Sequence, residues 1–261
     1  MKLIKQNPTS NGVRHRIKLQ KNLLCKNNKL IKQLLIGTKS WAGRNSINGR
    51  ITIRHRGAGS KKLFRIINFT NLPFFALVLG ITYDPNRNIF ISLNYNFETK
   101  NFFNTSAVHN VTPGSLIICQ ENAIDLRLGY RLRLKNIPVG ALINNIALNQ
   151  NAVTQYIRAA GTYGQLLQKN NNICKIKLPS GILLNLLPNS FATIGILTNL
   201  HNNKLIYGKA GYNRLRGFKS KVRGIAMNPV DHPHGGRSNG GCHPMTPWGK
   251  PTRGKPTKKN E

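Results

Sequence analysis

The residues best suited to acid–base chemistry lie near the C-terminal end of the sequence, where Asp231 precedes His232 and His234 follows two positions later. A histidine paired with a carboxylate can act as a general base in a nuclease or transferase, because imidazole titrates near neutral pH. Adjacent side chains rarely point at each other, however, and no motif places a Ser or Cys nucleophile close by. We therefore favour a hydrogen-bonding role for Asp231, which could accept from RNA hydroxyl, amino or backbone N–H groups, and keep the enzyme as an alternative.

Metal binding is the second chemistry that this segment suggests. His232, His234, Cys242 and His243 are of the residue types that bind zinc, but their spacing matches no standard zinc finger. The four cysteines of the chain are far apart and form no C-x-x-C pair, which argues against a disulfide framework and favours a reducing compartment. We predict no metal site and no cofactor, other than structural magnesium ions that a bound nucleic acid would carry.

Charge is the dominant property of the whole chain. Its 261 residues include 40 Lys+Arg and only 6 Asp+Glu, for a formal net charge of +34, while 39% of residues are hydrophobic. That apolar fraction can form a core, but no run approaches the roughly 18 residues that a membrane span needs. Six acids leave little material for a paired-carboxylate glycosidase or a carboxylate-bound magnesium site. Because so large a charge needs a polyanion to balance it, we predict a nucleic-acid partner and no small-molecule substrate.

The positive charge is concentrated towards the two ends of the chain. Residues 1–65 hold 17 Lys and Arg and no acid, residues 66–199 hold 10 against four acids, and residues 200–261 hold 13 against two. Runs this one-sided cannot be neutralised by internal salt bridges. The sequence therefore predicts a nearly neutral centre between two separate basic segments that contact nucleic acid.

Three glycine-containing motifs carry many of these cations. Residues 49–62 and 208–217 interleave glycines with Lys and Arg, which lets backbone N–H groups and side chains approach phosphates closely. The first of these motifs lacks the G-K-[ST] ending of a Walker loop. In the third, residues 158–165, small residues surround Tyr163, which could stack on a base or sugar. A core tyrosine in a tight loop is the alternative interpretation of that motif.

The central part of the chain has the pattern of short β-strands. Apolar runs at 76–81 and 89–93 flank the turn-forming residues 84–88, which predicts a hairpin. A second series of apolar runs, separated by Gly and Pro, lies at 116–118, 132–134, 141–143, 173–178, 182–186 and 192–197. Many short strands favour small closed barrels, because closure removes exposed edges. We predict an all-β fold of two barrels with a boundary near residues 98–112.

Three other segments give local predictions. Two isoleucines, Ile51 and Ile53, alternate with cations or threonine over residues 50–56, which predicts a strand with its cations on one face. Residues 17–36 are the one candidate for a long helix, although their periodicity is poor. After about residue 200, the abundance of Gly, Pro, Lys and Arg predicts an extended basic tail that becomes ordered on its partner.

Taken in order along the chain, these motifs resemble the universal ribosomal protein L2 family of the large subunit. The most specific matches are VRGIAMNPVDHPHGG at 222–236 and HPMTPWGKPT at 243–252. Further matches lie at 8–10, 14–15, 43–45, 49–52, 54–57, 83–87, 136–140, 160–163, 178–181 and 192–195. The resemblance therefore covers nearly the whole chain.

The resemblance implies an OB-type (oligonucleotide-binding) barrel followed by an SH3-like barrel, with basic extensions at both ends. The implied domains are an N-terminal extension (1–45), an OB-fold-like RNA-binding domain (46–108), an SH3-like barrel domain (109–200) and a Gly/Pro-rich C-terminal extension (201–261). It also implies a structural protein, not an enzyme, that binds large-subunit rRNA and supports the peptidyl-transferase region and subunit association. Its other partners would be neighbouring ribosomal proteins and the small subunit, with His232 the histidine nearest the peptidyl-transferase centre.

The family form that the chain resembles is bacterial or organellar. A basic N-terminus that already carries family residues, together with a bias towards Asn, Ile and Lys, favours synthesis inside an organelle. We expect the mitochondrial matrix, with the plastid and the bacterial cytoplasm as alternatives. The rival function from another class is that of a free single-strand nucleic-acid-binding protein.

The chain departs from the family pattern in two places that bear on function. Arg237 begins a segment in which the family usually has a third glycine and an acid, and residues 71–75 are hydrophobic where the family is more basic. We expect Phe74 and Phe75 in that hydrophobic stretch to contact a neighbouring protein. Burial of both rings in their own barrel would remove this expectation.

The motifs and the resemblance together define the RNA-binding residues that we predict. No catalytic residue is among them. They are Arg50, Arg54, His55, Arg56, Lys61, Lys62, Arg158, Thr162, Tyr163, Lys209, Arg214, Arg216, Lys221, Arg223, Asn228, Asp231, His232, His234, Arg237, Trp248 and Lys250.

Overall fold

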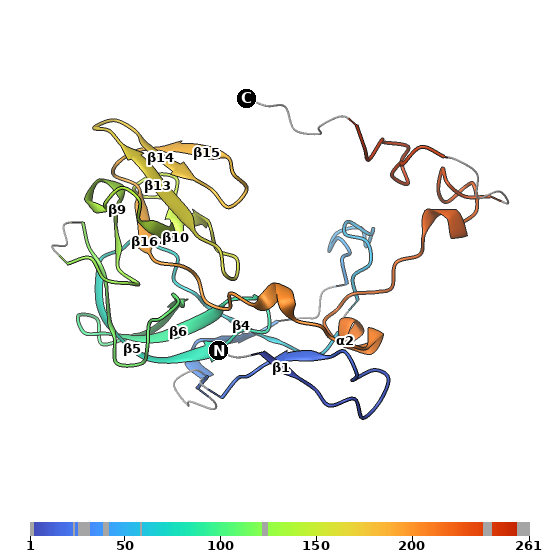
Figure 1. Cartoon of the computed structure of the whole chain (residues 1–261), viewed down its shortest axis with the longest axis horizontal. Helices are drawn as coiled ribbons and strands as arrows, with labels where there is room; N and C mark the ends of the chain where they lie inside the picture. Colours follow the sequence, from blue (N-terminus) through green and yellow to red (C-terminus); the bar gives the residue numbers. More distant parts are fainter. Residues whose placement is uncertain are drawn as a thin grey trace. The chain divides into compact units, whose positions relative to one another are not determined.

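The computed structural model describes residues 3–22, 24–25, 32–38, 42–57, 59–121, 125–236 and 242–254. These residues form mainly short β-strands, so the predicted all-β class is confirmed (Figure 1). No helix in this part of the chain is long and apolar enough to cross a membrane. The chain divides into two compact units. Unit 1 is Met1–Ser40 with Lys61–Tyr212, and unit 2 is Trp41–Ser60 with Asn213–Glu261.

The first group of strands in unit 1 is built around the predicted hairpin. It consists of β5 (Phe74–Tyr83), β6 (Phe90–Asn96), β7 (Phe102–Ser106) and β8 (Leu116–Cys119). β5 and β6 pair in antiparallel register, which confirms the hairpin, and β5 alternates buried with more exposed residues. The turn between them is held by the buried Asp84, which accepts from the Asn86 N–H at 2.8 Å and pairs with Arg87 at 2.8 Å.

The second group of strands surrounds its own apolar core. Its main strands are β9 (Arg131–Arg133), β10 (Leu142–Asn144), β13 (Gly164–Lys169), β14 (Cys174–Lys177), β15 (Leu183–Leu186) and β16 (Phe191–Ile194). The shorter elements are η1 (Leu134–Asn136), β11 (Ile146–Ala147) and β12 (Thr154–Tyr156). Leu132, Ile143, Leu166 and Ile176 are fully buried between them. The five predicted runs from 132 to 197 each overlap one of the main strands, and β13 is the main strand that no predicted run covers.

The predicted run at 116–118 is also a strand, but it belongs with the first group. This strand, β8, pairs with β5 over four residues, and its strand pairing with the second group is the single parallel pair of Cys119 with Arg131. That pair joins both groups into one ten-stranded sheet, in the order β15-β14-β13-β10-β16-β9-β8-β5-β6-β7. The sequence analysis grouped this run with the wrong strands, because an apolar run does not indicate which neighbour it will pair with. The domain limits themselves stay a prediction.

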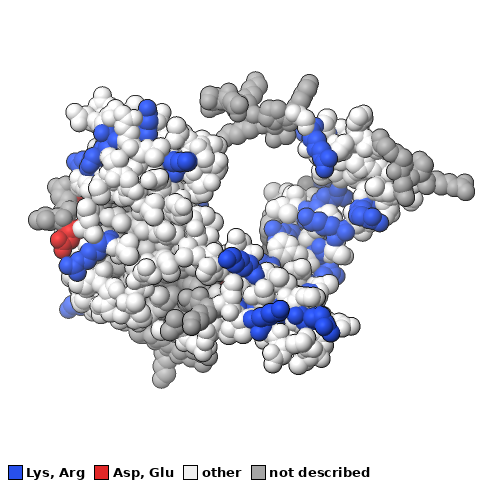
Figure 2. All heavy atoms as spheres, viewed as in Figure 1, with Lys and Arg blue, Asp and Glu red and all other residues white. Residues whose placement is uncertain are grey.

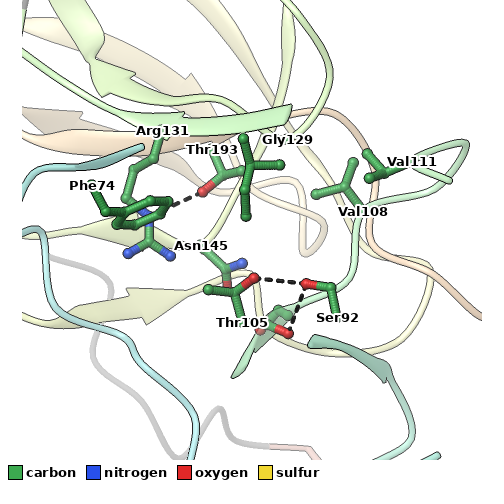
Figure 3. Close-up of a pocket in the computed structure, with 11 residues that line it drawn as sticks. Phe74, Ser92, Thr105, Val108, Val111, Gly129, Arg131, Asn145 and Thr193 are labelled. Atoms are coloured by element: carbon green, nitrogen blue, oxygen red, sulfur yellow. Dashed lines mark hydrogen bonds between the residues drawn. The ribbon is translucent and has the colours of Figure 1, made fainter. Parts of the chain in front are cut away.

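A buried arginine and a shared apolar cluster connect the two groups of strands. Arg131 is only 3% exposed, and its guanidinium donates to the Thr70 carbonyl at 2.5 Å and to the Thr193 hydroxyl at 3.3 Å. Figure 3 shows Arg131 and Phe74 among the residues that line a small pocket at this junction. Burial lowers the pKa of Arg131. Phe74 from the first group and Phe191 from the second pack in the same buried cluster, so the two groups share part of one core.

The N-terminal part of unit 1 contributes two further strand pairs. β1 (Leu3–Lys5) pairs with β2 (Ile17–Leu19), and β3 (Leu35–Gly37) pairs with β4 (Leu63–Arg65). The predicted helix over 17–36 is therefore wrong at both of its ends. Ile17 exchanges backbone hydrogen bonds with the distant Ile206, which lies just after η2 (Asn202–Lys204). These long-range partners override a weak local pattern.

The hydrophobic stretch at 71–75 is only partly available to a partner. Phe74 is 6% exposed and belongs to the buried core, so the expectation that it contacts a neighbouring protein is wrong. Phe75, the next residue of the strand, points to the other face and is 37% exposed, with its ring 5.2 Å from that of Phe97. Alternation along β5 therefore separates the two phenylalanines that the sequence analysis had treated together.

Candidate nucleic-acid interface

Unit 2 brings together two basic segments that are distant in sequence. The Gly57 N–H donates to the Gly217 carbonyl at 2.9 Å, and the Lys219 N–H donates to the His55 carbonyl at 3.0 Å. The Ser60 N–H donates to the carbonyl of Leu215, 155 residues further along the chain, at 2.8 Å. Gly59 has a φ of +65°, and a Cβ there would lie 2.6 Å from that carbonyl, which belongs to the last residue of α2 (Ala210–Leu215). The predicted separation into two independent basic segments is wrong for these residues, because backbone pairing joins them.

The loop at 43–54 has a different structure from the predicted strand. The N–H groups of Thr52 and Ile53 both donate to the Gly43 carbonyl, at 2.9 and 3.1 Å, and Ile51 forms a single bridge to Arg44. Ile51 is 59% exposed and Ile53 is 42% exposed. The strand prediction is wrong, because no sheet covers these isoleucines and local turns satisfy the backbone instead. Arg50 and Arg54 in the same loop are also exposed.

Aromatic rings and arginines are interleaved in this unit. The guanidinium carbons of Arg56 and Arg216 lie 4.5 and 5.4 Å from the ring centroid of Phe218, and that of Arg54 lies 5.6 Å from Trp248. Contacts of this length are attractive cation–π interactions, which hold long cationic side chains against an apolar ring. The arrangement fixes several positive charges on one framework.

Charge in unit 2 is strongly one-sided. Its two segments contain fifteen of the forty Lys and Arg residues and two acids, Asp231 and Glu261. Figure 2 shows Lys and Arg side chains gathered over this unit and spread more thinly over the visible face of unit 1. Like charges held this close repel one another, and an anionic partner relieves that repulsion.

The histidine segment is organised by backbone contacts. His232 is 8% exposed, and its Nδ1 atom accepts from the His234 N–H at 3.0 Å. Its ring stands against Gly224, at the start of η3 (Gly224–Ala226), where a Cβ would lie 2.7 Å from the imidazole. Asp231 is exposed. The Nδ1 atom that a catalytic carboxylate would orient is therefore already bonded to the main chain.

The ring of His234 also contacts backbone atoms. Its Nε2 atom lies 3.1 Å from the Met245 nitrogen and 2.7 Å from the His243 carbonyl oxygen. Among the residues that the structure describes, no three His, Cys, Asp or Glu side chains are placed to hold a metal ion together. His234 therefore fastens the segment that begins at 242 to the segment before 236.

The predicted RNA-binding residues are divided between the two units, and Arg237 lies outside the described residues. Unit 1 holds Lys61, Lys62, Arg158, Thr162, Tyr163 and Lys209. Unit 2 holds Arg50, Arg54, His55, Arg56, Arg214, Arg216, Lys221, Arg223, Asn228, Asp231, His232, His234, Trp248 and Lys250. The structure thus brings most of the set together in one unit, and the remaining six belong to the other.

In unit 1, the motif at 158–165 forms a tight loop with an exposed tyrosine. The Thr162 hydroxyl donates to the Ala159 carbonyl at 2.7 Å, and Gly161 has a φ of +69°. Tyr163 is 47% exposed, which removes the alternative of a core tyrosine. The guanidinium of Arg158 lies 4.9 Å from the ring centroid of Phe69.

The sequence analysis missed one contact between the chain's early and late basic parts. The guanidinium of Arg16 hydrogen-bonds the Tyr212 hydroxyl and lies 3.9 Å from the centroid of the tyrosine ring. These two residues are 196 positions apart. Tyr212 lies in the glycine-containing motif at 208–217, but nothing in that motif indicates Arg16 as its partner, so only the tertiary structure reveals the pairing.

The all-β fold and the basic, aromatic-rich unit define the class of β-structured nucleic-acid-binding proteins. Two family models match the chain: "Ribosomal Proteins L2, RNA binding N-terminal domain" over residues 31–119, and "Ribosomal Proteins L2, C-terminal domain" over residues 127–249. The chain belongs to the ribosomal protein L2 family.

Similar proteins occur in Reclinomonas americana and in bacteria. The chain is 43% identical to "Large ribosomal subunit protein uL2m" of Reclinomonas americana, over 99% of this chain and 94% of that protein. It is 42% identical to the proteins named "Large ribosomal subunit protein uL2" of Hyphomonas neptunium and Orientia tsutsugamushi, over 98% of this chain and 93% and 94% of theirs. The similarity thus extends over nearly the full length of each relative.

Proposed function

We propose that this chain is a structural component of the large ribosomal subunit that binds large-subunit rRNA during translation. The observation that carries the proposal is the joining of two basic segments, Trp41–Ser60 and Asn213–Glu261, into one unit with a large excess of positive charge. The near full-length similarity to proteins named as large-subunit components supports the same role. Phosphate contacts would come from the cations, and base or sugar contacts from Tyr163 and Trp248.

The protein acts in this proposal by positioning RNA, and the RNA supplies the catalytic groups. The segment around His232 would extend towards the peptidyl-transferase centre, and other surfaces would meet neighbouring ribosomal proteins and the small subunit. The bond from His234 to Nδ1 of His232 and the exposure of Asp231 support a positioning role over acid–base catalysis. Similarity to a protein named as the mitochondrial form supports a place in a mitochondrial ribosome, and similarity to bacterial proteins keeps a bacterial location as the alternative.

Salt dependence provides the direct test of the proposed electrostatic binding. For the full chain and a fragment of large-subunit rRNA, log K should fall linearly with log salt, by about 0.7 to 0.9 for each phosphate neutralised. Arg50→Gln should reduce the slope of log K against log salt by about the contribution of one phosphate contact. The control is Lys175→Gln on β14, which removes the same charge from an exposed position outside the predicted set. Binding that is insensitive to salt would contradict the proposal.

Two further measurements separate the rival functions. A free single-strand-binding protein should dissociate from the large subunit during sedimentation at high salt, whereas a structural component should co-migrate with it. A nuclease or transferase should process a labelled RNA in a single-turnover assay and lose that activity in His232→Ala. We expect co-migration and no turnover.

A further inference from the structure

Trp248 is the most exposed aromatic side chain of unit 2 among the residues described, with 73% of its surface accessible. It lies at the tip of a tight turn that is fixed by its own backbone. The Thr246 N–H donates to the Lys250 carbonyl at 2.8 Å, the Lys250 N–H returns to the Thr246 hydroxyl at 3.1 Å, and the Gly249 N–H donates to the Thr246 carbonyl at 3.0 Å. Gly249 has a φ of +76°, which a glycine adopts without strain. The turn therefore holds the indole away from its own backbone.

The base of this turn is also held in place. The Thr252 N–H donates to the Pro244 carbonyl at 2.9 Å, and Met245 bridges to Pro251. His234 contacts the backbone of residues 243 and 245. A large apolar ring on an anchored turn keeps little freedom to fold back onto its own chain, so its exposed area remains available to a partner.

The surroundings of Trp248 indicate what kind of partner suits it. The guanidinium of Arg54, from the other basic segment, lies 5.6 Å from the centroid of the indole, and both side chains are exposed. Lys250, two residues along the turn, is exposed as well. An aromatic face beside cations matches one nucleotide, because the base can stack on the ring while its phosphate meets a positive charge.

We propose that Trp248 is a stacking platform for an unpaired nucleobase, with Arg54 binding the phosphate next to that base. This inference rests on the proposed function and specifies which feature of the RNA this part of the protein recognises. Inside a duplex, each base is covered by its neighbours and offers no free face. A base in a loop, bulge or single strand offers its face at low cost. Trp248 therefore selects unpaired positions, while the other cations of unit 2 bind any phosphate backbone.

The test uses the fluorescence of Trp248 in the full chain. The sequence has two tryptophans, so Trp41→Phe leaves Trp248 as the sole reporter. This protein is titrated with a single-stranded RNA of about 12 nucleotides, within the site sizes of single-strand binders, and separately with the duplex of the same sequence. We expect the single strand to quench the indole emission by stacking and the duplex to bind without comparable quenching.

Substitutions divide the binding into its two parts. Trp248→Leu should weaken single-strand binding by about 5- to 150-fold and leave the salt dependence unchanged. Arg54→Gln should lower the slope of log K against log salt by about 0.7, the contribution of one phosphate contact, and should retain the quenching of the Trp248 emission. The matched control is Val230→Ala, which truncates another apolar side chain of unit 2 that is 90% exposed and should change neither measurement.

The outcomes distinguish this inference from the function on which it rests. If both RNAs bind with a steep salt dependence and the Trp248 emission does not change, the stacking platform is refuted and the proposed function stands. Equal quenching by duplex and single strand would also overturn the preference for unpaired bases. If neither RNA binds in a salt-dependent way, the proposed function itself fails.

Discussion

The thiol of Cys119 should make the protein less stable at alkaline pH. This side chain is 1% exposed at the end of β8, where its Sγ–H donates to the Asn71 carbonyl at 3.6 Å. Burial raises the pKa of Cys119 from 9.0 to about 11, and the nearby Arg131 opposes this only in part. Between pH 9 and 11 the folded protein keeps the thiol proton and the unfolded chain loses it. The free energy of unfolding therefore falls as pH rises through this window.

The size of the loss follows from the two pKa values. Each pH unit in the window costs about 1.36 kcal/mol, so a shift of about two units corresponds to about 2.7 kcal/mol of unfolding free energy. The loss should be complete near pH 11 and absent below about pH 8. Because Cys119 and Arg131 form the strand pair between β8 and β9, this titration reports on the junction of the two strand groups.

Urea unfolding of the wild type and Cys119→Ser at pH 8 and pH 11 measures the effect. Serine keeps a hydrogen-bond donor of similar size and does not titrate in this range. All other ionisable groups are the same in both proteins, so their contribution cancels in the comparison. We expect the stability difference between the two proteins to shift by about 2.7 kcal/mol against the wild type at pH 11. Identical pH dependence in both would refute the burial of the thiol on which the argument depends.

Two other substitutions, each with a control, test the packing inside each unit taken by itself. Gly59→Ala places a methyl group 2.6 Å from the Leu215 carbonyl oxygen and should increase hydrogen exchange of the Ser60 amide by at least about tenfold. The control is Gly49→Ala, which is also at positive φ but has open space around it and should leave the Ser60 amide protected. Phe191→Ala should cost about 3–5 kcal/mol in a single unfolding transition, and Leu183→Ala, which is 57% exposed, about 0.5 kcal/mol or less. Two separate transitions would contradict a core shared by both strand groups.

Local patterns predicted the strands well where one face of a strand is buried. The runs at 76–81 and 89–93 became β5 and β6, because alternation along the chain directly reflects which side of a sheet meets the core. The same argument failed at Ile51 and Ile53, which alternate without any sheet to cover them. Periodicity states which residues could share a face, and only a tertiary partner decides whether that face is buried.

The residue types of the candidate interface could be predicted from the sequence, but their arrangement in space could not. Glycines among cations, the histidine segment and Trp248 could be named from the sequence, since those residue types bind phosphates and bases wherever they occur. Their neighbours could not be named. The backbone bond from Ser60 to Leu215 joins residues 155 positions apart, and the burial of His232 depends on the space that Gly224 leaves.

The sequence by itself determined the net charge, its concentration towards the chain ends, the all-β class and the family resemblance, because each depends only on residue types and their order. The tertiary structure alone decided that β8 pairs with β5, that Arg131 is buried between two strand groups, and that the two basic segments form one unit. The physical reason is that backbone hydrogen bonds and packing form between residues that are distant in sequence. Their specificity comes from complementary shape and unsatisfied backbone groups, which no local pattern encodes.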